Sequence, residues 1–217
     1  MGFFRNIFGS STTEASLPGS RTQDPNVRRS TGFHEFIRYI AKPEGQVVLD
    51  LGATSPANLH FITGLGHRAY NVDLLLAAAE PDLLIDTGEE GQKRFDTIRL
   101  LDENLNYEAE LFDAVLLWDL ADYLPEEAVK PVIERLHVLM KPKGILFGFF
   151  HTKDAGPEVP FLRFNIASSD SLALRQGPHF RLQRVFNNRH IENLFYKYNS
   201  IKFFLGRDNM REVLVIR

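Results

Sequence analysis

The sequence predicts a single α/β domain built on a doubly wound, mostly parallel seven-stranded sheet that closes with a C-terminal antiparallel hairpin. The apolar run 47–51 stops at Gly52, and apolar residues then recur with helical spacing, which is typical of a strand, a tight loop and a helix. A second strand end follows at Asp73. Near the C-terminus, the apolar stretches 200–205 and 213–216 flank a turn-rich linker, which predicts the hairpin.

The composition fits one soluble globular domain. The 217 residues include 44% hydrophobic and 24% charged side chains, which are ordinary values for a domain with a sizeable core. The formal net charge of −3 gives no electrostatic basis for general nucleic-acid binding. The absence of cysteine excludes disulfides, thiolate metal sites and a cysteine nucleophile, and it fits a cytoplasmic location. The histidines show no metal-ligand spacing with carboxylates, so no metal site is expected.

Residues 1–30 are expected to form a flexible tail ahead of a domain spanning 31–217. Residues 10–30 are rich in Ser, Thr, Pro and Gly and poor in apolar side chains, so they bury too little surface to fold. Residues 1–8 form a short aromatic patch. Docking on its own domain, an oligomer interface and weak peripheral contact with a membrane all stay open for this patch. No apolar run is long enough to cross a bilayer, and the oligomeric state is left open.

The domain is predicted to begin with a helix. Apolar side chains at positions 33, 36, 37 and 40 follow helical spacing, and Pro-Glu-Gly at 43–45 ends the helix before the first strand. Packing against the sheet is the simpler interpretation of this helix. The alternative is that His34 or Tyr39 forms part of a lid over a bound ligand.

The loop after the first strand narrows the choice of ligand. In an open parallel sheet, ligands bind beyond the carboxyl ends of the strands, and an acid such as Asp73 can accept hydrogen bonds from both ribose hydroxyls. A dinucleotide fingerprint needs three glycines, but those positions hold Gly52, Thr54 and Ala57, and no P-loop lysine follows. The loop therefore disfavours a phosphate-bearing cofactor. A nucleoside with a compact zwitterionic tail, such as S-adenosyl-L-methionine, makes weaker demands, and Asp50 can face its ammonium group directly or through water.

This first motif resembles that of class I SAM-dependent methyltransferases, which reads acid, apolar, Gly, x, Gly. The stretch 112–119 resembles the fourth strand of that family, and 120–123 resembles the segment after it. The sequence at 139–144 is similar to the leucine, lysine, proline, glycine turn before the fifth strand. Together these matches extend over residues 33–151, and the C-terminal hairpin adds another. The resemblance implies a Rossmann-like methyltransferase fold and transfer of a methyl group to a small or medium-sized acceptor.

The resemblance also implies which residues hold the cofactor. They are Asp50, Gly52, Ala53, Thr54, Asn58, Asp73, Asp102, Trp118 and Asp119. One departure matters, because Thr54 and Pro56 stand where many family members have glycines, and Pro56 also removes an amide donor. Either the loop has a different but competent conformation, or cofactor binding has been lost.

Residues 74–111 leave two interpretations open. Residues 95–101 fit a third strand, whereas 89–106 fit one helix equally well, because apolar residues recur there at both periods. If the strand is right, Asp102 takes the place where the family often has an acid that contacts adenine. If the helix is right, that assignment fails.

The next elements are a helix and a strand. Pro125 opens the helix, and the acids beside it suit the positive end of the helix dipole. The nearly continuous apolar run 145–150 is typical of a central strand covered on both faces, and it ends at His151.

Residues 152–187 are longer than a plain connection and predict an inserted hairpin that covers the substrate. Three short strands are expected there, at 161–166, 172–174 and 180–185. A last helix is expected to begin near Asn187.

The candidates for chemistry lie at the ends of strands. Methyl transfer from a sulfonium requires mainly in-line alignment, and a base helps where the acceptor must lose a proton. Asp119 is the first candidate for that base, and His151 and Asp122 are the others. The structural alternatives are that Asp119 caps the following helix and that His151 is a hydrogen-bonded loop histidine.

The predicted function is methyl transfer from S-adenosyl-L-methionine to an unidentified small-molecule acceptor. The first alternative is a catalytically degenerate relative that acts as a binding or regulatory module through residues 1–8 or the insertion. A nucleotide-sugar or NAD-dependent enzyme is disfavoured by the absent glycines and by the terminal antiparallel hairpin.

Overall fold

A six-stranded mixed sheet forms the centre of the molecule. The computed structural model describes residues 26–88, 93–153, 161–206 and 209–217. The strand order is β10-β11-β7-β6-β2-β3, with parallel pairing from β3 to β7 and antiparallel pairing at β11 and β10. The strands are β2 (Val47–Asp50), β3 (Arg68–Asn71), β6 (Phe112–Trp118), β7 (Met140–His151), β10 (Ser200–Leu205) and β11 (Met210–Ile216). The predicted parallel centre and antiparallel C-terminal pair are confirmed.

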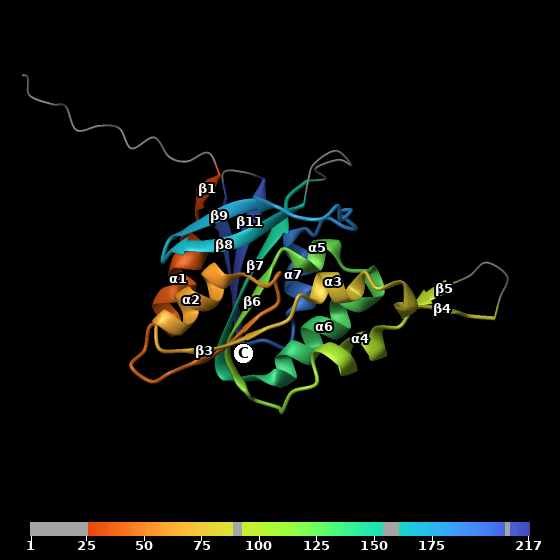
Figure 1. The fold of residues 1–217 in the computed structure, drawn as a ribbon, viewed down its shortest axis with the longest axis horizontal. Coiled ribbons are helices and arrows are strands. Elements are labelled where there is room, and N and C mark those ends of the chain that lie inside the picture. The colour runs from red at the N-terminus through yellow and green to blue at the C-terminus, as the bar shows by residue number, and fades with distance from the viewer. Residues whose placement is uncertain (1–25, 89–92, 154–160, 207–208) are drawn as a thin grey trace, which may run out of the picture.

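Helices cover both faces of this sheet (Figure 1). Successive strand residues point to opposite faces, so Val48 packs with the core of one side and Leu49 with the core of the other. One face is covered by α1 (Thr31–Ile40) and α2 (Pro56–Gly64). The other face is covered by α3 (Leu74–Ala78), α4 (Thr97–Asn104), α5 (Leu120–Tyr123), α6 (Glu126–Leu139) and α7 (Asn188–Leu194).

Several predicted elements begin where the sequence places a cap. The Ser30 side chain accepts a hydrogen bond from the backbone of Phe33 at the start of α1, and Asn187 does the same for His190 at the start of α7. Pro125 precedes α6, as predicted. Strand β7 is longer than expected because residues 141–144 bulge away from β6 before regular pairing resumes.

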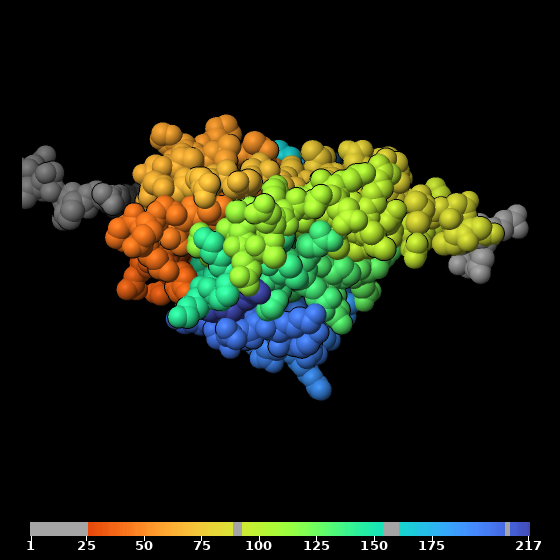
Figure 2. Space-filling model, turned by 90° about the horizontal axis from the view of Figure 1, so that it is seen from below, coloured from red at the N-terminus to blue at the C-terminus, as the bar shows by residue number. Residues whose placement is uncertain are grey.

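Of the two interpretations left open for residues 74–111, the third strand at 95–101 is wrong, and among the described residues the sheet has six strands instead of the predicted seven. Residues Lys93–Phe95 form β5, which pairs with β4 (Leu84–Asp86) in a separate two-stranded ribbon after a short 3-10 helix, η1 (Pro81–Leu83). The Asp96 side chain then caps α4 by accepting a hydrogen bond from the Arg99 backbone at 3.1 Å. Figure 2 shows the β4–β5 ribbon projecting from the body of the molecule. The helical interpretation therefore holds for residues 97–104.

A second sheet crosses the molecule at the upper ends of β6 and β7 in Figure 1. It contains β1 (Val27–Arg29), β9 (Ser171–Gln176) and β8 (Leu162–Ser168), in the order β1-β9-β8. We call the β8–β9 hairpin the cover. Two of the three strands predicted in the insertion are present, but the one expected at 180–185 is wrong, because this segment has no regular structure.

The boundary of the predicted N-terminal tail is also wrong. Residues Val27–Arg29 pair with β9 instead of belonging to a tail that ends at residue 30. The Arg28 guanidinium donates to the Glu212 carboxylate at 2.7 Å, and both side chains are buried. This long-range ion pair holds β1 against the C-terminal strand. The aromatic patch at 1–8 lies outside the described residues.

Candidate functional site

A pocket lies at the carboxyl ends of β2, β3 and β6, under the cover. Its empty volume is about 460 Å³, including its open mouth. Its wall toward the sheet comes from the loop after β2 and from the end of β6, and its roof comes from the start of the cover. The lining residues are Leu51, Gly52, Ala53, Asp73, Leu75, Leu117, Trp118, Asp119, Leu120, Phe161, Leu162, Arg163, Phe164 and Phe180.

Asp50 ends β2 but does not line this pocket. Its Oδ1 accepts hydrogen bonds from the backbone of Gly52 at 2.9 Å and from Trp118 Nε1 at 2.6 Å, and its Oδ2 accepts one from Asn58 Nδ2 at 3.0 Å. Burial raises the pKa of the Asp50 carboxyl, while these donors act in the opposite direction. Three protein groups already donate to its oxygens, and the contact of Asp50 with a ligand ammonium group stays a prediction.

Trp118 explains why residue 52 is glycine. A Cβ atom at Gly52 would stand 2.6 Å from Trp118 Cδ1 and 2.8 Å from Nε1, so a side chain at this position would collide with the indole. The Trp118 backbone has a φ of 52°, a left-handed value that is uncommon for a bulky residue. Its ring stacks on Phe164 of the cover, with centroids 5.5 Å apart and planes 5° from parallel. Gly52 therefore accommodates Trp118 as well as bordering the pocket.

Asn58 connects the loop after β2 to the cover. Besides donating to Asp50, its Nδ2 donates to the backbone oxygen of Phe164 at 3.3 Å, and its Oδ1 accepts from the backbone of Ile166 at 2.7 Å. The side chain is buried and does not line the pocket. Its position holds β8 in register over the loop.

Thr54 is also turned away from the pocket lining. Its hydroxyl donates to Asn71 Oδ1 at 2.5 Å, and Asn71 Nδ2 in turn donates to the backbone oxygens of Asp50 and Gly52. The loop that lacks the usual glycines is therefore fixed by side-chain hydrogen bonds to β3.

Asp73 is the strand-end acid that faces the pocket. Its side chain is 20% exposed, and Oδ1 accepts a hydrogen bond from the backbone of Leu76 at the start of α3. Arg163 Nη2 lies 4.0 Å from Oδ2, which is beyond hydrogen-bond distance. The outer oxygen of Asp73 is thus placed to accept hydrogen bonds from a ligand.

Asp119 is buried at the end of β6 and lines the pocket. It takes the N-cap position of α5, but its side chain makes no capping hydrogen bond, so the structural alternative of a helix cap is wrong. Burial raises the pKa of the Asp119 carboxyl to about 7, while the nearby His151 lowers it and Asp122 raises it. A carboxyl with this pKa exchanges a proton near neutral pH, which suits a general base.

His151 and Asp122 form a pair that does not line the pocket. Asp122 Oδ2 lies 2.8 Å from His151 Nδ1 and accepts the His151 backbone N–H at 2.6 Å. Asp122 is fully buried, and burial raises its pKa against the lowering effect of the histidine. The pair anchors the end of β7, which matches the hydrogen-bonded loop histidine that was the alternative to catalysis.

Asp102 lies within α4 and does not follow a strand. Its carboxylate accepts from Arg135 Nη2 at 3.0 Å, and its side chain is 61% exposed. Because the adenine contact depended on a strand at 95–101, that assignment fails.

The structure brings together part of the predicted site. Gly52, Ala53, Asp73, Trp118 and Asp119 line one pocket. The four residues that line the roof, 161–164, were predicted only as part of a covering insertion, and Arg163 was not singled out. The available signal was a single arginine among the apolar residues of 161–164.

Two further findings bear on the described part of the chain. Its His, Asp and Glu side chains form no group of three or more that could hold a metal ion. In the same residues, no helix is both long and apolar enough to cross a membrane.

The strand order, the parallel centre, the antiparallel C-terminal pair and a pocket at the carboxyl ends of the strands together define a doubly wound, Rossmann-like α/β fold. It lacks one strand of the predicted seven among the described residues.

No protein-family model and no curated protein matches the chain. Among solved structures, a 1,6-didemethyltoxoflavin-N1-methyltransferase from Burkholderia thailandensis, with bound 1,6-didemethyltoxoflavin and S-adenosylhomocysteine, is 15% identical, with 86% of this chain and 76% of that chain covered and a TM-score of 0.47. An S-adenosylmethionine-dependent methyltransferase from Mesorhizobium loti is 18% identical, with 83% and 95% covered and a TM-score of 0.48. A SAM-dependent methyltransferase from Archaeoglobus fulgidus is 12% identical, with 85% and 92% covered and a TM-score of 0.48. Similarity at this level does not identify the ligand of this chain.

Proposed function

We propose that the protein is a methyltransferase that binds S-adenosyl-L-methionine in the pocket at the carboxyl ends of β2, β3 and β6. The observation that carries this proposal is the pair of acids at the pocket, Asp73 and Asp119, each following a parallel strand and each lining the same space. Asp73 has an oxygen available for ribose hydroxyls, and Asp119 has a pKa near neutrality.

The residues present fit this cofactor at its nucleoside end. Asp73 would hold the ribose hydroxyls, and the loop at Gly52 and Ala53 would border the methionine portion. Asp50 has a different role in this proposal, since its oxygens orient Trp118, Asn58 and the loop. When bound, the cofactor supplies an electrophilic methyl group on a positively charged sulfur.

Asp119 is the residue we propose as base. It is buried beside the pocket, and its carboxylate form can accept the proton that a hydroxyl or amine acceptor loses as the new bond to carbon forms. His151 lowers the pKa of Asp119 and Asp122 raises it, and neither residue lines the pocket. The acceptor enters under the cover, beside Phe161 of the roof and Phe180, which packs against it.

The test is calorimetric titration of the full chain with S-adenosylmethionine, S-adenosylhomocysteine and NADH. Saturable binding of the first two and none of NADH is expected. Asp73→Ala should weaken binding of S-adenosylhomocysteine by about 1.5–3 kcal/mol, or roughly 10- to 150-fold, because it removes hydrogen bonds to a charged group.

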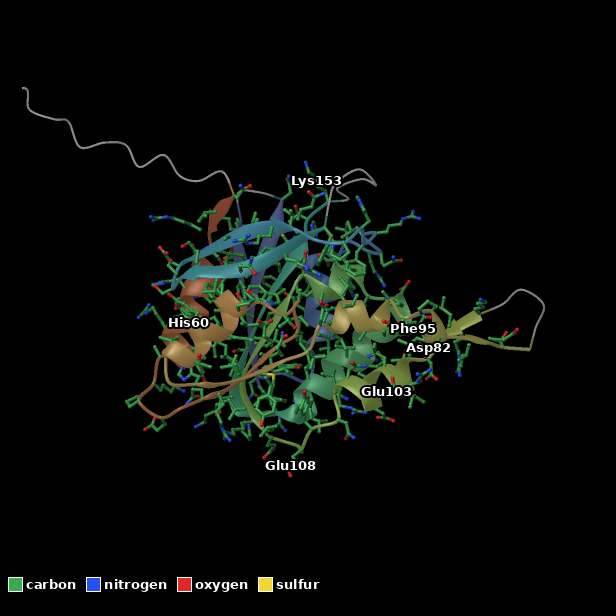
Figure 3. All side chains as sticks on the ribbon, viewed as in Figure 1. His60, Asp82, Phe95, Glu103, Glu108 and Lys153 are labelled. Atoms are coloured by element: carbon green, nitrogen blue, oxygen red, sulfur yellow. The ribbon has the colours of Figure 1, made fainter. Side chains whose placement is uncertain are left out.

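Glu108→Ala is the matched control, because Glu108 is an exposed acid far from the cover (Figure 3). Its affinity should equal that of the wild type. If folded wild-type protein binds neither SAM nor its product, the proposal fails, and a binding or regulatory role takes its place.

A further inference from the structure

The pocket has one cationic side chain among its lining residues, Arg163, which enters from the roof. Its Nε is buried and has no hydrogen-bond partner among the described residues. Its only carboxylate neighbour in the same part of the chain is Asp73, at 4.0 Å. Buried donors are normally hydrogen-bonded, so an unpaired guanidinium nitrogen beside a pocket calls for an explanation.

The cover places a second arginine opposite the first. In the antiparallel register of β8 and β9, Arg163 pairs with Arg175, so the two side chains leave the hairpin on the same face. Like charges directly opposite each other destabilise a strand pair. Arg175 is exposed and has no ion pair with any residue that the structure describes.

The stem of Arg163 is held in place by its surroundings. A Cβ atom at Gly177 would stand 3.2 Å from Arg163 Cγ and 2.7 Å from the Phe161 ring, so glycine allows the chain to pass close to both side chains. Phe161 in turn packs edge-on against Tyr123 and Phe180, with ring centroids 4.9 and 5.2 Å away. Arg163 therefore lies beside a cluster of aromatic rings that pack against one another.

The segment 161–187, which contains the cover, differs in charge from the whole chain. Residues 161–187 contain four arginines and one acid, Asp170, in a protein whose formal net charge is −3. The acid lies at the hairpin turn, and Arg184 is paired with Glu126. In Figure 3, Lys153 lies at the cover end of the molecule, whereas Asp82, Glu103 and Glu108 lie away from it.

We propose that the acceptor carries an oxyanion, a carboxylate or a phosphate, on an apolar body, and that Arg163 and Arg175 bind this oxyanion. As a statement about the acceptor, this rests on the proposed function. The apolar body packs against Phe161, Phe180 and the leucines of the pocket. An oxyanion supplies the acceptor for Arg163 Nε and offsets the repulsion between the two guanidinium groups, since a guanidinium matches the geometry of both anions.

The experiment titrates the full chain with four probes that share a ring and differ in charge: benzoate, phenyl phosphate, benzyl alcohol and benzylamine. The two anions should bind more tightly than the alcohol and the amine, and the stronger of them identifies the kind of oxyanion. Arg163→Gln should weaken anion binding about tenfold or more, since a charge-assisted hydrogen bond is lost. Arg175→Gln should weaken it about threefold, because Arg175 is exposed.

Two variants make the result specific. Arg163→Lys keeps the charge and should recover part of the affinity. Arg68→Gln removes an exposed arginine at the start of β3, at the opposite end of the strand from the pocket, and should bind the anions as the wild type does. Thermal unfolding of each variant verifies that it is folded. If Arg163→Gln does not fold, the anion affinity of Arg175→Gln tests the proposal instead.

The outcomes separate this inference from the proposed function. Equal anion affinity in the wild type, Arg163→Gln and Arg175→Gln overturns the inference, as does equal binding of benzoate, phenyl phosphate and benzyl alcohol. A loss of S-adenosylhomocysteine affinity in Arg163→Gln assigns the arginine to the cofactor and also overturns it. Anion binding that depends on Arg163 in a protein that does not bind S-adenosylhomocysteine supports the anion site, while the proposed function fails.

Discussion

The carboxyl ends of β2 and β6 carry buried acids in equivalent places, yet the two acids have different environments. Asp50 has three hydrogen-bond donors on its carboxylate, from Gly52, Asn58 and Trp118. Asp119 has no capping hydrogen bond to α5, and it lines the pocket. Both have a pKa raised by burial, but only Asp50 is compensated by several hydrogen bonds.

This difference separates a structural acid from a candidate functional one. A carboxylate whose oxygens are all engaged stabilises the residues that donate to it, and its removal leaves those donors unpaired. A carboxylate that is buried with few donors destabilises the fold when ionised, and such strain is characteristic of functional sites. Measurements of protein stability therefore distinguish Asp50, at the end of β2, from Asp119, at the end of β6.

Asp50→Ala should have the largest effect. It leaves the Trp118 indole N–H, the Asn58 amide and the Gly52 backbone N–H without their acceptor, and two of these groups are buried. We expect a loss of about 3–5 kcal/mol in the free energy of unfolding, as for breaking a buried charged network. Urea denaturation followed by Trp118 fluorescence measures this loss directly.

The control for Asp50→Ala is Asp102→Ala, which removes an exposed acid whose only described partner is Arg135. Its cost should be below about 1 kcal/mol, the usual range for a surface ion pair. Equal losses in the two variants would contradict the assignment of Asp50 as the anchor of the loop.

Asp119→Asn should act in the opposite direction. The pKa of Asp119 rises from 3.8 to about 7 on folding, so between these values the native state binds more protons than the unfolded state, and stability falls as pH rises. The free-energy cost of ionising the buried Asp119 carboxyl is absent below pH 4 and fully present above pH 7. We expect Asp119→Asn to be more stable than the wild type by about 2–4 kcal/mol at pH 8 and equally stable near pH 4.

The measurement is the free energy of unfolding of both proteins at several pH values between 4 and 8. His151, Asp122 and Arg28 all act on the charge of Asp119, so each must stay unchanged in the comparison. A difference that does not vary with pH would show that Asp119 is ionised normally in the folded protein, and its proposed role as base would fall.

The sequence predicted those elements whose own pattern decides their structure. The apolar runs of β2, β6 and β7 and the helices α1, α6 and α7 lie where local periodicity placed them. Strand β1 could not be predicted in this way, because it depends on pairing with β9 and on the ion pair of Arg28 with Glu212. Periodicity left a strand at 95–101 and a helix at 89–106 equally open, and the Asp96 cap decides between them because it ends the extended segment there and starts α4.

The sequence predicted those site residues whose position depends only on following the end of a strand. Asp73 and Asp119 line the pocket because each follows a parallel strand. The engagement of Asp50 could not be read from the sequence, since its partner Trp118 is 68 positions away along the chain. The pairing of Arg163 with Arg175 depends on the hairpin register, which is set by the turn at 168–171.

Thr54→Val should have the smallest effect on stability of these substitutions. Valine has nearly the shape of threonine but cannot donate to Asn71 Oδ1, the bond that ties the loop after β2 to β3. Because Thr54 is exposed and water can replace the lost partner, we expect a loss of only about 0.5–1 kcal/mol in the free energy of unfolding. The affinity for S-adenosylhomocysteine should fall by a similar amount if the tie fixes the loop for binding, since a mobile loop must then be ordered. A loss of stability without any change in affinity would show that Asn71, through its bonds to the backbone of Asp50 and Gly52, holds the loop sufficiently by itself.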